Sequence, residues 1–304
     1  MKIAITGATG LIGKYLVERL PEHELLLIGR SAKKLRETFH ERRKITLCET
    51  DYSAQSLLKI LKNTGVVVHL AARPARKDFK EFSSYNWLIR ISENLFKTCS
   101  ALGIKNVIFA SSKTVYSPLV NHIPYRESEV VYPSTLYGVS KLTVEKIGFF
   151  HNLNLKALRF TEIRAFSERS GVMFMTFIQR ALKGKPITIY GDGKGVREYL
   201  YVKDAVAAIA AAIPATAVRG VFNIGSGVAT SNRELAELVR EVFSGGRSEI
   251  RYDLNKPEAL SQYPMDNSRA QKFLNWKPAY SLKKALQEMK DFYDGRAVDF
   301  TILS

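Results

Sequence analysis

Cysteine is scarce in this chain of 304 residues, which carries only Cys48 and Cys99, without the spacing of a metal site. So few cysteines argue against a disulfide framework and a cysteine zinc site, and suit a reducing cytosol. Long hydrophobic runs are missing too. The longest strongly apolar stretch, Ala205 to Ile213, is too short and too rich in alanine to span a bilayer. We therefore expect a cytoplasmic protein without a membrane partner.

Acidic residues are also in short supply. There are 29 Asp and Glu against 46 Lys and Arg, so the formal net charge is +17. Such an excess attracts polyanions, anionic surfaces or a small phosphorylated ligand. The basic residues are spread along the chain, and the short runs Lys33-Lys34 and Arg42-Arg43-Lys44 lack interleaved aromatic residues. A solvated basic surface is the simplest interpretation, and RNA binding is kept as an alternative.

The N-terminus has the pattern of a phosphate-binding turn. A short apolar strand, Lys2 to Thr6, runs into the sequence GATGLIG and then into a helical pattern. Glycines at this junction allow a tight turn and close backbone approach, and the helix N-terminus offers free amides to a pyrophosphate. The pattern predicts a dinucleotide site whose cofactor-binding residues here are Gly7, Gly10, Leu11, Ile12 and Gly13.

The second strand, residues 24–28, ends without the acidic residue that usually bonds the adenosine ribose of NAD. Gly29 leaves space at this point, and Arg30 with Ser31 is suited to hold a 2′-phosphate. We therefore expect NADP(H) to be favoured over NAD(H). The alternative is that Arg30 stacks on the adenine or lies in solvent.

Two more strands extend the pattern. The strand of residues 44–47 is followed by Asp51 and Tyr52, which are placed to meet the adenine. The strand of residues 65–70 is followed by Ala71 and Ala72, whose small side chains let a cofactor lie against the strand end. His69 is internal to this apolar strand, so we expect a packed histidine without a catalytic role. The cofactor contacts predicted in these segments are Asp51, Tyr52, Leu70, Ala71 and Ala72.

A long helix over residues 83–101 and a fifth strand over 106–110 follow. Strands alternating with helices predict an α/β fold, a Rossmann-type doubly wound parallel sheet, with its ligand across the carboxyl ends of the strands. The glycine turn, Ala71-Ala72, Ser111-Ser112 and Tyr137 all map to that edge.

Tyr137 and Lys141 lie four residues apart in a helical pattern, so they share one face of the helix. A free phenol has a pKa near ~10 and is a poor base. An ammonium about 6 Å away, at an effective dielectric of about 20, stabilises the phenolate by roughly 3 kcal/mol. The pair is therefore suited to take a proton from a sugar hydroxyl while hydride leaves the same carbon. Taken alone, this spacing also fits a plain helix with a half-buried tyrosine.

Several further segments complete a resemblance that covers nearly the whole chain. Together with the glycine turn, they resemble the extended short-chain dehydrogenase/reductase family, the nucleotide-sugar epimerases and dehydratases of UDP-glucose 4-epimerase type. The matching segments are HLAA at 69–72, SSKTVY at 111–116, YGVSK at 137–141, GDG at 191–193, REYLYVKD at 197–204, NIGSG at 223–227 and LNWKP at 274–278.

The resemblance assigns roles to individual residues. Tyr137 would be the acid/base, Lys141 would hold the nicotinamide ribose and lower the pKa of the tyrosine, and Ser112 would bond the reacting hydroxyl. Arg197 would neutralise the substrate diphosphate, for which its guanidinium fork is suited. Phe160 would lie near the nicotinamide and Tyr190 near the nucleotide base.

The chain departs from the family in two places. Dehydratases and decarboxylases of the family carry an acid just after the catalytic Ser/Thr, where this chain has Lys113 and Thr114. This disfavours both activities and leaves reversible hydride transfer at C4. Glu162 stands where an amide usually meets the substrate, and Arg164 replaces a tyrosine. A carboxylate there would repel the diphosphate unless it pairs with Arg164 or bonds the sugar.

We therefore expect an NAD(P)-dependent 4-epimerase of a nucleotide-diphosphate hexose. An NADPH-dependent reductase of an NDP-4-keto-deoxysugar is the alternative that Arg30 favours. An RNA-binding member of the same fold would suit the charge, but the intact Tyr137 and Lys141 argue against it. The resemblance further implies a homodimer through a four-helix interface of residues 83–101 and 137–150.

The expected domains are a dinucleotide-binding unit over residues 1–165, to which 199–213 returns, and a smaller α/β C-terminal unit over 166–304 that binds the nucleotide sugar. No metal site is expected.

Overall fold

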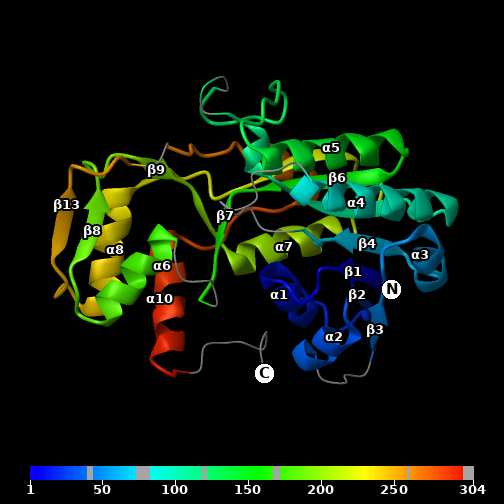
Figure 1. Ribbon diagram of the computed structural model, residues 1–304, viewed down its shortest axis with the longest axis horizontal. Helices are drawn as coiled ribbons and strands as arrows, with labels where there is room; N and C mark the ends of the chain where they lie inside the picture. The colour runs from blue at the N-terminus through cyan, green and yellow to red at the C-terminus, as the bar shows by residue number, and fades with distance from the viewer. Residues whose placement is uncertain are drawn as a thin grey trace.

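A seven-stranded sheet forms the centre of the computed structural model, and every neighbouring pair of its strands is parallel. The structure describes residues 1–39, 44–72, 83–117, 119, 122–166, 172–258 and 261–296. The basic pair Arg42-Arg43 lies outside these ranges. The strand order is β11-β6-β5-β4-β1-β2-β3 (Figure 1). This order confirms the Rossmann-type doubly wound sheet. The strands are β1 (Lys2–Thr6), β2 (Glu24–Gly29), β3 (Ile45–Glu49), β4 (Val66–His69), β5 (Asn106–Ser112), β6 (Asn154–Phe160) and β11 (Gly220–Ile224).

The central strands are apolar throughout because both faces of the sheet are covered. Side chains alternate between the faces, so Ile3 and Ile5 of β1 join one hydrophobic cluster and Ala4 joins the other. Strands β4 and β5 are buried at every position. This continuous burial is the reason why these strands were visible in the sequence as short apolar runs.

Helices lie on both faces of the sheet (Figure 1). One face carries α1 (Leu11–Arg19) and α7 (Val202–Ala212), which pack on each other, with α2 (Ala32–Thr38) nearby. The other face carries α3 (Ala54–Ile60), α4 (Ser83–Ala101) and α5 (Leu136–Phe150), with α4 packed between its two neighbours.

A smaller α/β region lies beside the sheet, at the left of Figure 1. Helices α6 and α8 pack on each other there, and β8 pairs with β13 in parallel. Its elements are α6 (Met173–Leu182), β8 (Ile187–Tyr190), α8 (Asn232–Ser244), β13 (Ile250–Asp253) and α10 (Leu282–Tyr293). The remaining elements of the described residues are short: η1 (Lys113–Val115), β7 (Glu162–Arg164), β9 (Val196–Arg197), β10 (Tyr199–Tyr201), β12 (Thr230–Ser231) and α9 (Ser268–Leu274).

More of the C-terminal half returns to the sheet than residues 199–213. Strand β11 pairs with β6 from Gly220↔Lys156 to Ile224↔Phe160. It supplies hydrogen-bond partners to an edge of β6 that would otherwise be unpaired. Within the described residues, no helix combines the length and the hydropathy of a membrane span.

Candidate active site at the carboxyl edge of the sheet

The glycine turn after β1 lies against the end of β4. Gly7 has a φ of 72°, and a Cβ on it would lie 2.6 Å from the backbone N of Ala71. The backbone N of Ala71 donates to Thr6 Oγ1 at 3.2 Å, which ties the two strand ends together. Gly10 precedes α1 as its N-cap, and its N–H donates to Gly7 O at 3.0 Å. A turn bounded by two glycines at a helix N-terminus fits the pyrophosphate of a dinucleotide.

The other residues predicted around this turn lie beside it. Leu11 and Ile12 occupy the first turn of α1 and pack partly buried on the core, while Gly13 is buried against Ala8. Leu70, Ala71 and Ala72 follow β4, whose last residue pairs with Thr6 of β1.

At the end of β2, Arg30 is exposed and its Cζ lies 4.8 Å from the ring centroid of Trp87 on α4. Tyr52 packs edge-on against the same tryptophan at 6.1 Å and is only 2% exposed. Trp87 was not among the predicted residues. Nothing in the sequence links it to Arg30, because the contact joins a strand end to a helix more than fifty residues later.

Two predicted cofactor residues also stabilise local structure. Ser31 is the N-cap of α2, and its Oγ accepts from Lys34 N at 3.2 Å. Asp51 is exposed and its Oδ1 accepts from Ser53 N at 2.8 Å, a bond that lowers the pKa of the carboxyl.

His69 is a packed residue, as predicted. Its Nδ1 lies 2.7 Å from Thr6 Oγ1 and its Nε2 lies 2.8 Å from Ser92 Oγ. Burial, with a smaller contribution from Lys141, lowers its pKa to about 3. The ring is therefore neutral at physiological pH and serves the packing between β4 and α4.

Ser112, Tyr137 and Lys141 lie at the junction of β5 and α5. Ser112 ends β5 beside Phe160 of β6, and its Oγ accepts from Thr114 Oγ1 at 3.0 Å. The Nζ of Lys141 lies 5.6 Å from the ring centroid of Tyr137 and donates to Ala110 O at 2.6 Å. The spacing in the sequence thus corresponds to a real pair on one face of α5.

Burial dominates the titration of this pair. It raises the pKa of Tyr137 to about 12, with a further contribution from Tyr85, and it lowers the pKa of Lys141 to about 7 against the opposing charge of Glu145. We had expected the ammonium to lower the pKa of the phenol. In this structure burial and Tyr85 raise the pKa of Tyr137 instead, because desolvation disfavours the charged form of both groups.

Gly138 lets α5 approach the residues after Ser112. A Cβ on it would lie 2.2 Å from Thr114 O and 2.9 Å from Pro133 Cβ. We expect Gly138→Ala to destabilise the fold by ~1–3 kcal/mol and to lower kcat at least tenfold, because α5 must shift Tyr137 away from Ser112. Gly65→Ala is the control, since its Cβ would meet nothing closer than 3.4 Å. Unchanged kcat in the Gly138 variant would show that the contact relaxes elsewhere.

Two buried lysines make stability depend on pH. Burial lowers the pKa of Lys141 to about 7 and that of Lys156 to about 8. Both groups titrate near ~10.4 in the unfolded chain, which therefore binds more protons than the folded chain between these values. We expect the free energy of unfolding to rise by ~2 kcal/mol from about pH 7 to about pH 8.5. Urea unfolding at several pH values checks this, with Lys141→Met expected to remove most of the rise. A flat or falling profile would contradict it.

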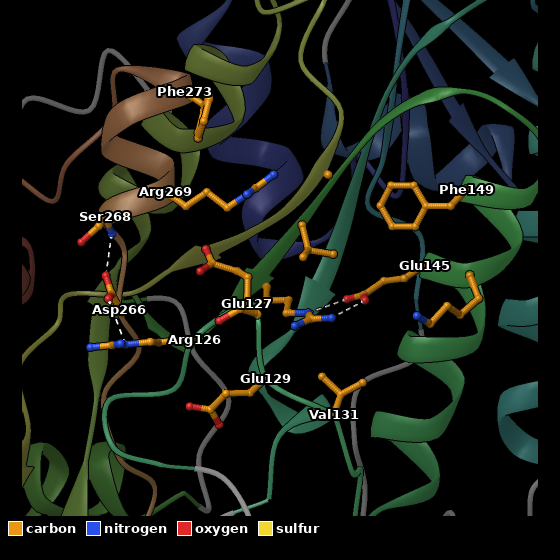
Figure 2. Close-up of a pocket in the computed structure, with 15 residues that line it drawn as sticks. Arg126, Glu127, Glu129, Val131, Glu145, Phe149, Asp266, Ser268, Arg269 and Phe273 are labelled. Carbon is orange, nitrogen blue, oxygen red and sulfur yellow. Dashed lines mark hydrogen bonds and ion pairs between the residues drawn. The ribbon is translucent and has the colours of Figure 1, made fainter.

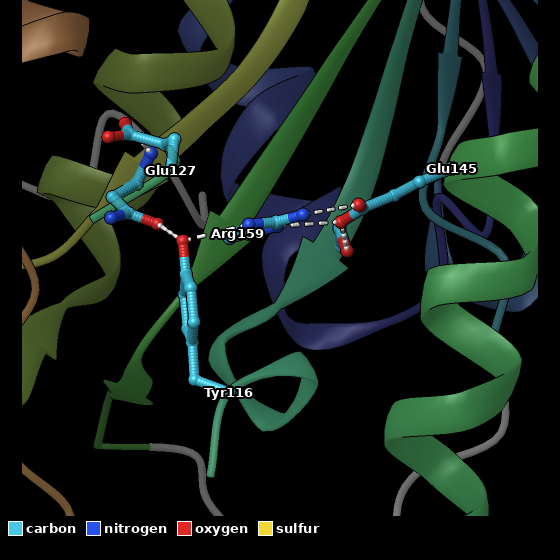
Figure 3. Close-up of polar contacts among 6 residues, drawn as sticks. Tyr116, Glu127, Glu145 and Arg159 are labelled. Atoms are coloured by element: carbon cyan, nitrogen blue, oxygen red, sulfur yellow. Dashed lines mark hydrogen bonds and ion pairs between the residues drawn. The ribbon is translucent and has the colours of Figure 1, made fainter. Parts of the chain in front are cut away.

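A buried polar network fixes the far side of this junction (Figure 3). Glu145 of α5 accepts from Arg159 Nη2 at 2.7 Å and from Ser111 Oγ at 2.5 Å. Arg159 Nη1 donates to Tyr116 OH at 2.8 Å, and Tyr116 OH donates to Asn223 Oδ1 at 2.8 Å. The network joins β5, β6, β11 and α5. It was missed in the sequence, although Glu145 follows Lys141 by four residues and so shares its face.

A cavity of about 570 Å³ opens beside this network (Figure 2). Its walls include Glu145, Arg159, Arg269, Phe149 and Phe273, with the two aromatic residues on opposite sides of the view. None of the residues predicted for cofactor or substrate lines it.

The predicted substrate residues Glu162 and Arg197 form an ion pair, with Arg197 Nη1 2.7 Å from Glu162 Oε1. Arg164 Nη2 also donates to Glu162. Burial alone would raise the pKa of Glu162, but Arg164, Lys113 and Arg197 together lower it. The carboxylate is therefore neutralised by arginines, which removes the repulsion expected toward a diphosphate.

Tyr190, predicted to meet the nucleotide base, ends β8 in the smaller region and is 49% exposed. The ammonium of Lys256 lies 4.6 Å from its ring centroid. The ring thus lies at the surface of the smaller region, at the end of β8 that leads into the Gly191-Asp192-Gly193 segment.

A parallel doubly wound sheet, a glycine turn after β1 and a Tyr–Lys pair on α5 define a class of dinucleotide-binding α/β enzymes. Residues 3–225 match the NAD dependent epimerase/dehydratase family. The chain belongs to this family and is an NAD(P)-dependent enzyme of the extended short-chain dehydrogenase/reductase type.

Individual relatives agree with this assignment. The chain is 29% identical to an uncharacterized UDP-glucose epimerase, YtcB, of Bacillus subtilis, over 94% of this chain and 96% of the relative. The crystal structure of UDP-N-acetylglucosamine 4-epimerase from Bacillus cereus is 30% identical, with a TM-score of 0.85 over 98% of both chains. MoeE5 in complex with UDP-glucuronic acid and NAD is 27% identical, with a TM-score of 0.80 over 97% of this chain and 100% of that chain.

Proposed function

We propose that this enzyme is a nucleotide-sugar 4-epimerase that works by reversible hydride transfer at C4 of an NDP-hexose. The observation that carries the proposal is the Tyr137–Lys141 pair of α5, with Lys141 Nζ bonded to Ala110 O of β5, two residues before Ser112 at the end of that strand. Similarity to proteins described as UDP-sugar 4-epimerases supports it.

In the proposed mechanism, Tyr137 accepts the proton of the C4 hydroxyl while Ser112 bonds the same oxygen. A bound dinucleotide would supply the hydride acceptor and, when oxidised, a positive charge that favours the phenolate. Tyr137 lies beside Lys141, whose ammonium would favour the phenolate form of Tyr137 that accepts this proton. After the 4-keto sugar has rotated within the site, the same phenol returns the proton. Tyr137 therefore acts as the acid/base for both faces of C4.

We assign the substrate diphosphate to Arg197 and the base to Tyr190, with Glu162 holding Arg197 in place at 2.7 Å. A division at about residue 165 into a cofactor unit and a sugar-nucleotide unit goes with this assignment. A homodimer through α4 and α5 is proposed on the family resemblance and on the packing of these two helices side by side.

We also propose that NADP(H) is favoured over NAD(H). The end of β2 has Gly29 and Arg30 where an acidic residue would favour NAD. The exposed guanidinium of Arg30 lies over Trp87, where we expect it to hold a 2′-phosphate. The solved MoeE5 complex contains NAD, so the preference is a property to be tested in this chain. The same feature favours the second candidate, an NDP-4-ketosugar reductase that releases its cofactor at each turnover.

The first experiment denatures the purified protein and identifies any released dinucleotide by mass. A near-stoichiometric amount of NAD or NADP supports the epimerase, because an epimerase keeps its cofactor through turnover. A protein that is purified empty and binds NADPH much more tightly than NADH supports the reductase. If neither dinucleotide binds, the enzymatic proposal fails.

A further inference from the structure

The cavity beside the Arg159–Glu145 pair has no part in the mechanism proposed above. Its walls come from residues 126–131, the C-terminal half of α5, strands β6 and β11, and residues 266–273 (Figure 2). Its volume of about 570 Å³ lies within the range of small-molecule sites, roughly 300–1,000 Å³. The cavity is therefore large enough for a ligand of its own.

Charges of both signs line the cavity in equal number. Four basic side chains face four carboxylates, so the walls are neutral overall. Two pairs are already closed within the protein. The buried Arg159 pairs with Glu145 at 2.7 Å, and Arg126 lies 3.5 Å from Asp266. Because a neutral lining gives a nucleotide or another polyanion no net attraction, the walls favour a ligand without net charge.

Arg269 of α9 is held in the cavity wall by aromatic rings. Its Cζ lies 5.2 Å from the ring centroid of Phe222 and 5.2 Å from that of Phe273. Among the described residues, its guanidinium has neither a hydrogen bond nor an ion pair. The rings orient the planar group and leave its N–H donors to solvent or to a ligand. A carboxylate can accept two of these donors at once.

Glu127 lines the same cavity, and no ion pair joins it to Arg269 within the described residues. Its Oε1 accepts from Asn223 N at 2.7 Å. Burial raises the pKa of its carboxyl, and the charge of Arg269 opposes this increase. Of the other two charges, Lys146 is exposed on α5 and Glu129 accepts from a backbone N–H at 3.1 Å. Arg269 and Glu127 are thus opposite charges that share the cavity and remain apart.

We infer that this cavity binds a free α-amino acid with an aromatic side chain. The ligand carboxylate accepts from Arg269 and its ammonium donates to Glu127, so one small molecule pairs with both groups. Its ring packs against Phe149 and Phe273, which lie on opposite sides of the view in Figure 2. This is a second site, and the inference does not rest on the proposed epimerase activity.

Ligands that lack one of these three parts fit less well. A carboxylate without an ammonium pairs with Arg269 but puts a second negative charge beside Glu127. An amine without a carboxylate pairs with Glu127 and adds a positive charge beside Arg269. In each case a charge is desolvated without compensation. A zwitterion without a ring leaves the two aromatic walls in water.

Titration calorimetry of the full chain with L-phenylalanine tests the site. We expect a dissociation constant on the order of 0.1–1 mM, as the size of the ligand allows. Three analogues that each lack one part should bind at least tenfold more weakly: 3-phenylpropionate without the ammonium, L-phenylalaninamide without the carboxylate, and L-alanine without the ring. Saturation with L-phenylalanine should also raise the melting temperature of the chain.

Two variants assign the charges of the ligand to the residues. Arg269→Met should weaken the binding of L-phenylalanine by about 10- to 100-fold and remove the preference over L-phenylalaninamide. Glu127→Gln keeps an acceptor for Asn223 N and should remove the preference over 3-phenylpropionate. Arg251→Met removes an exposed arginine that pairs with Glu249 outside the cavity, and it should leave the affinity unchanged.

Three results would overturn the inference. The first is the absence of binding by L-phenylalanine, L-tyrosine and L-tryptophan at concentrations well above the expected constant. The second is equal binding of L-phenylalanine and 3-phenylpropionate to the wild-type chain, which would mean that no ammonium is recognised. The third is wild-type affinity in Arg269→Met, whose exposed side chain can be removed without disturbing the core. Because binding is measured directly, failure of the epimerase proposal leaves each of these results interpretable.

Discussion

Replacement of Tyr137 with Phe is expected to lower kcat by about 10²- to 10⁴-fold, the contribution typical of a positioned acid/base. The variant loses only the hydroxyl, and its ring keeps its packing 6.0 Å from that of Tyr85. Affinity for the dinucleotide and the melting temperature should stay close to wild type. Single-turnover reduction of the enzyme-bound cofactor by substrate measures the affected step directly, because proton and hydride leave the same sugar carbon in it.

The matched control is Tyr15→Phe on α1. The Tyr15 hydroxyl is buried and makes no hydrogen bond among the described residues, so its removal should change neither stability nor kcat appreciably. If Tyr137→Phe instead keeps activity within tenfold of wild type, the proton must be taken by another group and the proposed mechanism is wrong.

The second large effect concerns the ion pair of Arg159 and Glu145. Arg159→Met is expected to lower the free energy of unfolding by ~3–5 kcal/mol, because it leaves a buried carboxylate without its cation. The side chains of the pair are 4% and 1% exposed and are joined by two hydrogen bonds, of 2.7 and 3.0 Å (Figure 3). Ser111 Oγ donates to the same carboxylate but carries no charge to replace the guanidinium.

A double-mutant cycle tests this explanation. Glu145→Gln combined with Arg159→Met should be less destabilising than the sum of the two single changes, because the double variant buries no unpaired charge. Lys97→Met removes an exposed partner of Glu93 and should cost less than ~1 kcal/mol. Additive single changes would show that the pair contributes little as a pair. Since Glu145 also opposes the lowering of the Lys141 pKa, its loss should further reduce the charge on that lysine.

The sequence by itself determined the local units of the fold. The β1–turn–α1 unit could be recognised because glycine spacing and a helix start are local properties of the sequence. The central strands could be recognised because strands buried on both faces are continuously apolar. Tyr137 and Lys141 could be placed on one face of α5 because a spacing of four residues has this effect in any helix. Their position at the carboxyl edge then followed from the alternation of strands and helices.

Only the tertiary structure decided which distant groups meet and how they titrate. β11 joins the sheet about sixty residues after β6, Arg30 lies on Trp87, and Glu162 pairs with Arg197. None of these pairings leaves a periodic signal in the sequence. The pKa of Tyr137 rises although Lys141 lies beside it, because desolvation depends on the whole packed environment of a group and the spacing of two residues does not report it.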